Sequence, residues 1–192
     1  GGALGAALIP YGDKVQFSPF LGYNILRKPD PNEIVAELLS EGIVGVANGR
    51  SEFGPRALGN RSLLADPRKI STKHQVNAIK RRQKFRPFAP AILEEYCTDY
   101  FEMPGHSRYM SYVYQCKRPH DIPAVLHVDN SARVQTVPES SESILREILE
   151  VWYEHTGCPV LLNTSLNIRG MPMVNDFCDA LNFSAKYRVD VY

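Results

Sequence analysis

The chain has 192 residues, 44% of them hydrophobic and 22% charged, with a formal net charge of +1. A chain of this length and composition forms an ordinary globular domain, and its balanced charge gives no general reason to expect nucleic-acid or membrane binding. The four cysteines and five histidines show no metal-ligand spacing. The sequence therefore predicts neither a zinc site nor a disulfide framework, and a reducing cytoplasm is the expected location.

The predicted elements alternate between helices and strands. Residues 1–28 are rich in glycine and are expected to be irregular. The run Asp30-Pro31-Asn32-Glu33 supplies an N-cap, a proline in the first turn and a glutamate at the third helical position, which predicts a helix that Gly42 ends. Further strands are predicted over residues 43–47, 62–65, 88–93, 107–116, 133–137, 160–162 and 189–192, and further helices over 71–79, 140–155 and 176–187. This interleaving indicates a mixed α/β domain.

The most informative segment is Gly49–Ser62, GRSEFGPRALGNRS, which combines glycines with arginines. Glycine allows the backbone to approach a ligand closely, and arginine offers a planar fork that matches phosphate and carboxylate oxygens. A turn-rich surface loop with solvated arginines is the alternative interpretation. The density of both residue types favours a loop that binds a nucleotide or another phosphorylated ligand.

Two further segments support this interpretation. Lys80–Pro90, KRRQKFRPFAP, begins with a basic run, although such a run is also typical of a solvated face. Gly157–Asn167, GCPVLLNTSLN, is typical of a buried strand whose carboxyl end presents amide and hydroxyl side chains. Ligands of α/β sheets bind beyond such strand ends. A helix cap or a turn is the alternative interpretation of the Asn-Thr-Ser cluster.

Together with Ser131–Val137, SARVQTV, these segments resemble the C-terminal domain of the O-carbamoyltransferases that act on nodulation factors, cephalosporins and aminoglycosides. The longest matching stretch is GRSEFGPRALGNRSLLADPR at Gly49–Arg68. The family's C-terminal domain is similar in fold to the YrdC and Sua5 proteins. The resemblance therefore implies a twisted mixed α/β sheet flanked by helices over residues 29–192. Residues 1–28 resemble a remnant of the family's preceding Kae1-like domain, followed by a linker.

The resemblance also implies a reaction and its partners. The family's C-terminal domain binds ATP, accompanied by Mg²⁺, together with carbamoyl phosphate, and forms carbamoyl adenylate. The preceding Kae1-like domain then transfers the carbamoyl group to a hydroxyl of a small molecule. Fe²⁺ or a similar metal is expected only in that preceding domain. The sequence leaves open whether two copies of the chain form a homodimer.

The positions that match the family's motifs carry the site residues that the resemblance implies. Lys80 and Arg86 are expected to grip the phosphates during catalysis. The residues expected to bind ATP or carbamoyl phosphate are Arg56, Arg133, Asn163 and Ser165. No residue is assigned to a metal.

Several neighbouring residues have other expected roles. Arg61 and Arg82 are either surface charges or ligand-binding cations, and Lys84 is expected to be solvated. Glu52 is expected to orient an arginine. The aromatic side chains expected in the core are Phe85, Phe88 and Trp152.

Two positions depart from the family's pattern. Gln83 stands where related sequences carry a glutamate, and Met171 precedes Pro172 where they carry Glu-Pro. Loss of these carboxylates leaves a catalytically inactive nucleotide-binding domain as one alternative function. A YrdC-like acyl-adenylate domain in tRNA modification is another, but the Gly49–Ser62 motif resembles the carbamoyltransferases and not the tRNA enzymes.

Overall fold

A five-stranded mixed sheet forms the centre of the computed structural model, which describes residues 2–12 and 17–192. The strand order is β2-β4-β9-β5-β8, and only the β5–β8 pair is parallel. The strand bounds are Ile43–Ala47 for β2, Arg61–Ala65 for β4, Ala89–Leu93 for β5, Gln135–Val137 for β8 and Val160–Ser165 for β9. The predicted twisted mixed sheet flanked by helices is confirmed.

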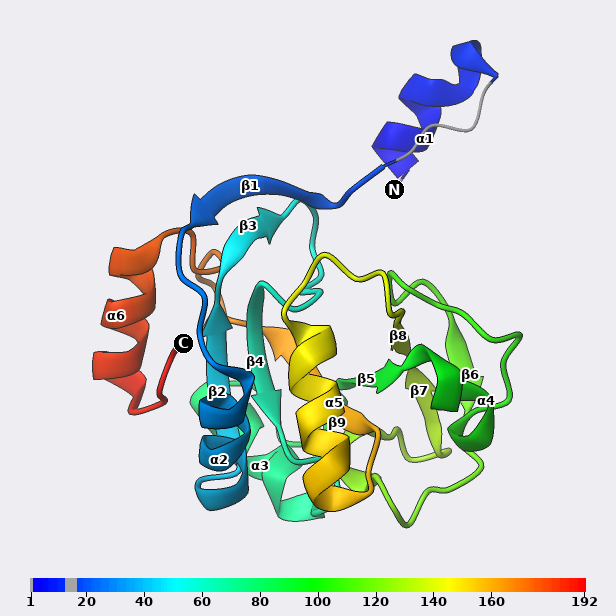
Figure 1. Cartoon of the computed structure of the whole chain (residues 1–192). Coiled ribbons are helices and arrows are strands. Elements are labelled where there is room, and N and C mark those ends of the chain that lie inside the picture. The colour runs from blue at the N-terminus through cyan, green and yellow to red at the C-terminus, as the bar shows by residue number, and fades with distance from the viewer. Residues whose placement is uncertain (1, 13–16) are drawn as a thin grey trace.

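Helices cover both faces of this sheet (Figure 1). On one face lie α2 (Pro31–Ser40) and α5 (Leu145–Thr156). The buried positions of α5 recur at helical spacing, at Leu145, Ile148, Leu149 and Trp152, so one stripe of the helix packs on the sheet. On the other face, α3 (Ile70–Ile79) and α6 (Phe177–Tyr187) contribute to a second apolar cluster.

Two small antiparallel sheets lie beside the central one. β1 (Phe20–Ile25) pairs with β3 (Gly49–Glu52), and β6 (Val113–Gln115) pairs with β7 (Ser131–Arg133). The remaining elements are α1 (Gly2–Leu8), α4 (Cys97–Tyr100) and the 3-10 turns η1 (Ile9–Tyr11), η2 (Glu94–Tyr96) and η3 (Pro123–Val125). In Figure 1, α1 extends away from the body of the molecule. Among the described helices, none combines the length and the apolar character that a bilayer crossing requires.

Several predicted boundaries are wrong. The described part of residues 1–28 is not irregular throughout, because it includes α1 and the paired strand β1. The strand predicted over 107–116 shrinks to β6, and Met110, with a φ of 54°, lies before it in the left-handed region, which regular strands do not use.

The strand predicted over 133–137 is two strands in different sheets. β7 ends at Arg133 and β8 begins at Gln135, so the chain changes partner at Val134. The helix predicted from Ser140 begins at Leu145, whose backbone N–H donates to the Ser143 hydroxyl. At the chain end, Val191 forms a single parallel bridge to Gly45 and not a full strand.

Candidate anion-binding site

Three arginines from distant parts of the chain meet beside the carboxyl end of β9. Arg56, Arg82 and Arg133 line a cavity of about 120 Å³ together with the strand end at Asn163 and Ser165. The other lining residues are Pro55, Ala57, Pro87, Phe88, Ala89, Met110 and Thr164. We call this cavity the arginine pocket. Its position agrees with the expectation that ligands of an α/β sheet bind beyond a strand end.

No carboxylate among the described residues balances the positive charge of the arginine pocket. None of its three arginines forms an ion pair with a residue that the structure describes. Burial, and then the nearby Arg56 guanidinium, lower the pKa of Arg133. The Arg133 Nε is buried and lacks a hydrogen-bond partner among the described residues. Because a buried donor without an acceptor is costly, the unpaired Arg133 Nε fits an anionic ligand that supplies the acceptor.

Arg82 is held in place by its surroundings. Its Nε donates to the Asn77 Oδ1 at 2.6 Å, its Nη2 donates to the Pro87 carbonyl at 3.2 Å, and its guanidinium lies 4.1 Å from the centroid of the Phe88 ring. Burial, followed by the charge of Arg86, lowers the pKa of Arg82 to about 10. The sequence left this residue undecided, and the structure places it in the pocket.

Lys80 lies next to the arginine pocket but does not line it. Its side chain is buried, at 4% exposure, and its Nζ contacts the carbonyl and hydroxyl oxygens of Ser165 and the carbonyl and Oδ1 of Asn167, the latter two at 2.9 and 3.0 Å. An ammonium has three protons, so these four oxygens occupy all of its donors. Burial, followed by the charge of Arg82, lowers the pKa of Lys80 to about 7. Lys80 therefore shapes the strand end that borders the pocket.

The loop that carries Arg56 is held in position by a buried carboxylate. The Glu52 Oε1 accepts hydrogen bonds from the backbone N–H groups of Leu58, Asn60 and Arg61 at 2.7, 2.8 and 3.2 Å. Glu52 thus orients the arginine-bearing loop through its backbone and not through a guanidinium. Gly59, with a φ of 131°, is required here because a Cβ would lie 2.1 Å from the Ser143 hydroxyl.

Two buried amides hold the same loop from the sheet. Asn163 donates to the Ala57 carbonyl at 3.2 Å, and Gln135 donates to the Leu58 carbonyl at 3.1 Å. Asn163 also donates to the Gln135 Oε1 at 2.7 Å, so the two amides are hydrogen-bonded to each other. The Asn163 Oδ1 remains buried without a partner among the described residues. Gln135, which the sequence did not single out, therefore positions the pocket as directly as Asn163 does.

Arg61 has a different role from Arg56. It is 0% exposed, and its guanidinium donates to the backbone carbonyls of Tyr23, Asn48, Gly49, Asn60 and Asn175. The surface-charge interpretation is wrong for this residue, and it does not line the arginine pocket either. Arg61 ties β1, β3 and the segment before α6 together.

The structure thus brings together four of the six expected site residues, Arg56, Arg133, Asn163 and Ser165. Lys80 adjoins them from its buried position, whereas Arg86 is exposed and outside the lining. After α3 the chain turns through Arg81, which has a φ of 52°, and this turn directs Arg82 toward the pocket. Asn77 and Phe88 flank the basic run in the sequence, and they supply the amide and the ring that contact Arg82. These two residues are the sequence features that could have pointed to Arg82 as the arginine that lines the pocket.

Of the other residues that the sequence analysis singled out, some lie where they were expected and one does not. Lys84 is exposed, as predicted, and Phe88 and Trp152 are buried, but Phe85 is 76% exposed and does not belong to the core. The departing residues Gln83 and Met171 are both exposed and lie outside the lining of the arginine pocket. Within residues 2–12 and 17–192, no group of three or more His, Cys, Asp or Glu side chains could hold a metal ion.

Structural comparison shows which solved structures share this fold. Full-length HypF in the phosphate- and nucleotide-bound form superposes with a TM-score of 0.64 at 14% identity, over 86% of this chain and 25% of HypF. A Sua5 variant from P. abyssi superposes with a TM-score of 0.58 at 13% identity, over 88% of this chain and 48% of Sua5. These similarities establish the YrdC-like fold of the domain.

Sequence comparison identifies closer relatives. Nodulation protein NolNO of Sinorhizobium fredii is 42% identical over 82% of this chain and 24% of its own length. Nodulation protein U of the same species is 43% identical over 72% of this chain and 25% of its own length. The chain thus spans about a quarter of the length of these relatives. The model of the carbamoyltransferase C-terminus family matches residues 35–192, and this chain belongs to that family.

Proposed function

We propose that this domain binds ATP and carbamoyl phosphate in the arginine pocket and forms carbamoyl adenylate. The observation that carries the proposal is the convergence of Arg56, Arg82 and Arg133, unbalanced by any described carboxylate, on one strand end. Two polyanionic substrates that react side by side require several cations in one place. Membership of the carbamoyltransferase C-terminus family supports carbamoyl chemistry at this site.

The proposed reaction needs positioning and charge neutralisation more than covalent help. Water cleaves carbamoyl phosphate to phosphate and carbamate, and the carbamate oxygen then attacks the α-phosphorus of ATP while pyrophosphate leaves. The arginines neutralise the phosphate oxygens that would otherwise repel the attacking carbamate. Each hydrogen bond between a guanidinium and a phosphate contributes roughly 1.5–3 kcal/mol net.

The described pocket does not fit a protein-held magnesium ion. Mg²⁺ in nucleotide sites is bound by one or two carboxylates together with substrate phosphates. The described lining of the arginine pocket contains arginines, amides and hydroxyls but no carboxylate. In the proposal, Mg²⁺ therefore accompanies ATP through its phosphate oxygens, and no step is assigned to it.

Transfer of the carbamoyl group to a hydroxyl of a small molecule is proposed for a preceding Kae1-like domain. The relatives support this division, because the matched region covers only about 24% of NolNO. A role in tRNA modification rests on the fold likeness to Sua5 alone. An inactive domain rests on Gln83 and Met171, which are both exposed and away from the described pocket lining.

The proposal is tested by incubating the chain with ATP and carbamoyl phosphate and measuring pyrophosphate release. Release is expected only when both substrates are present. Arg133→Ala and Arg82→Ala should each lower kcat/KM at least tenfold, the effect of one lost charged hydrogen bond. Arg169→Ala, which removes an exposed arginine outside the pocket, is the control. Equal activity of all three variants, or release without carbamoyl phosphate, would show that the proposed function is wrong.

A further inference from the structure

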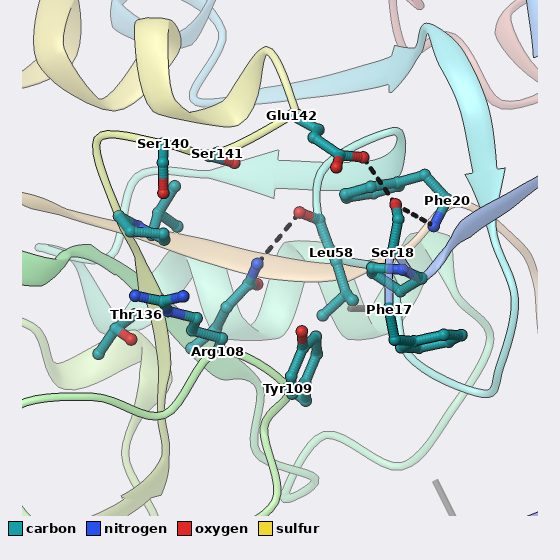
Figure 2. A pocket seen from close by; sticks show the side chains of 14 residues that line it. Phe17, Ser18, Phe20, Leu58, Arg108, Tyr109, Thr136, Ser140, Ser141 and Glu142 are labelled. Atoms are coloured by element: carbon teal, nitrogen blue, oxygen red, sulfur yellow. Dashed lines mark hydrogen bonds between the residues drawn. The ribbon is translucent and has the colours of Figure 1, made fainter. Parts of the chain in front are cut away.

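A cavity of about 240 Å³ is formed by α6 and by the segment that follows β9. Its lining consists of residues 167–168, residues 171–174 and one face of α6, and we call it the α6 cavity. Among the described residues, none lines both this cavity and the arginine pocket. By contrast, the cavity of about 180 Å³ beside β8 belongs to the candidate site, because Leu58 of the arginine-bearing loop lies in its wall (Figure 2).

The α6 cavity has an apolar floor and a rim whose charges balance. The floor contains Ile168, Val174 and Phe183, none of which is more than 7% exposed. Asp179 and Lys186 are exposed and bring one charge of each sign to the lining. Apolar walls with a few polar groups are typical of sites that bind small molecules. Because the lining carries no net charge, the cavity fits an uncharged ligand.

Thioethers and aromatic rings narrow the choice of ligand to a flat aromatic group. Met171 and Met173 line the cavity together with Phe183 and Tyr187, whose ring centroids lie 4.8 Å apart. The Tyr187 hydroxyl lies 4.0 Å from the Met171 sulfur, so α6 and the segment after β9 meet there. Methionine sulfur makes favourable contacts with aromatic rings, and its unbranched side chain adapts to a ligand. Sites for drug-sized molecules measure roughly 300–1,000 Å³, so this cavity suits a compound with a single ring.

The neutral lining depends on Met171. This residue stands where related sequences carry a glutamate, and it is exposed and lines the cavity. A glutamate there would add a negative charge that no further cation of the described lining balances. The residue that departs from the family's pattern is therefore the one that keeps the α6 cavity suited to an uncharged ligand.

One side chain connects the α6 cavity to the strand end beside the arginine pocket. Asn167 lines the cavity, and its Nδ2 donates to the Met171 carbonyl at 2.9 Å. Its Oδ1 accepts hydrogen bonds from the Ser165 hydroxyl at 2.7 Å and from the Lys80 Nζ at 3.0 Å. Ser165 in turn lines the arginine pocket. A ligand that packs against Met171 therefore contacts the same turn that holds Ser165 and Lys80.

We propose that the α6 cavity is an effector site, which binds a small, uncharged aromatic compound and thereby raises the affinity of the arginine pocket for anions. A ligand held against Met171 restricts the turn that Asn167 spans, so less conformational entropy is lost when an anion fixes Ser165. By linkage, an anion in the arginine pocket raises the affinity for the aromatic compound by the same factor. The inference does not depend on the proposed formation of carbamoyl adenylate.

Benzyl alcohol and cyclohexylmethanol are the probes for the site, because they differ only in whether the ring is aromatic. In NMR titrations of the 192-residue chain, benzyl alcohol should cause saturable shifts of residues 167–174 and 179–187 at millimolar concentrations. Cyclohexylmethanol should bind more weakly, because a saturated ring offers the thioethers no aromatic contact. Equal affinity of the two alcohols, or no saturable shift of these residues, would overturn the proposed site.

Met171→Glu tests the lining, and Leu181→Glu is its matched control. Both positions are similarly exposed, at 51% and 52%, and Leu181 lies on α6 outside the lining. Met171→Glu should bind benzyl alcohol roughly fivefold more weakly, because the ligand would desolvate an unpaired carboxylate. Leu181→Glu should bind it as the unmodified chain does. If circular dichroism shows both variants folded and they bind equally, the ligand does not occupy the α6 cavity.

Calorimetry with sulfate tests the effector role. Saturating benzyl alcohol should raise the sulfate affinity about twofold or more in the unmodified chain and in Leu181→Glu. The same concentration should have no effect in Met171→Glu. If sulfate does not bind, or if its affinity does not respond to benzyl alcohol, the effector role is wrong. Pyrophosphate release is measured separately, so failure of the proposed reaction would leave these results unchanged.

Discussion

At the scale of single residues, some side chains of the candidate site face the pocket, and others hold those side chains in position. Arg56, Arg82 and Arg133 face the pocket, whereas Lys80 is buried behind the strand end. A cation next to an anion site still acts at a distance through its charge, because the protein interior screens less than water does. The protonation state of Lys80 should therefore influence the pocket without contact to the ligand.

We predict that anion affinity falls as the pH rises through the pKa of Lys80. Burial lowers that pKa to about 7, so the side chain is charged below pH 7 and neutral above it. Sulfate is the suitable probe because its own charge stays constant over this range. Its affinity, followed by calorimetry between pH 6 and pH 8.5, should decrease several-fold as the pH rises.

Lys80→Met should bind sulfate weakly at every pH and show a flat profile. The control is Lys84→Met, which removes an exposed lysine of the same basic run and should keep the slope of the unmodified chain. An equal slope in Lys80→Met and the unmodified chain would assign the pH dependence to another group.

At the scale of elements, the loop between β3 and β4 is the part of the fold that shapes the site. It is held through backbone groups by side chains of β3, β8 and β9. β8 and β9 belong to the central sheet and β3 pairs with β1, so the loop takes its shape from paired strands. A loop bound in this way can hold Arg56 at the pocket before any ligand binds.

We predict that Gln135→Ala destabilises the chain by about 1–3 kcal/mol, the cost of leaving buried polar partners unpaired. The substitution removes the donor to the Leu58 carbonyl and one of the two acceptors of the Asn163 amide. Urea unfolding measures the change. Gln115→Ala is the matched control, because Gln115 is an exposed glutamine that also donates to a backbone carbonyl, that of Asp129. A similar small loss in both variants would contradict the role given to Gln135.

At the scale of the whole molecule, the sequence predicted the α/β class and most of the central strands, because apolar runs and helix caps are local signals. It could not show that Val134 separates two sheets, since strand partners are set by tertiary packing. It also found the arginine-rich segments, but it could not show that Arg82 and not Arg86 lines the arginine pocket, because the direction of a side chain after α3 depends on the turn at Arg81. Gln135 lies in the matching stretch Ser131–Val137, but no local signal showed that its amide holds the Leu58 carbonyl.

We predict that the 192-residue chain releases pyrophosphate from ATP and carbamoyl phosphate but carbamoylates no hydroxyl acceptor. The proposed transfer step belongs to a Kae1-like domain, and a reactive mixed anhydride that leaves the pocket should hydrolyse in water. Mass spectrometry of a panel of hydroxyl compounds, including aminoglycosides, checks the products. A carbamoylated acceptor formed by this chain alone would contradict the proposed division of labour.

The ribbon formed by β1 and β3 gives the N-terminal segment a mechanical connection to the pocket. β1 pairs with β3 outside the central sheet, β3 ends at Glu52, and Arg61 holds the Tyr23 carbonyl of β1. A two-stranded ribbon on its own is only marginally stable, so it depends on contacts such as this one. A displacement of β1 would therefore reach Glu52, and with it the loop that carries Arg56, through the ribbon and not through the central sheet.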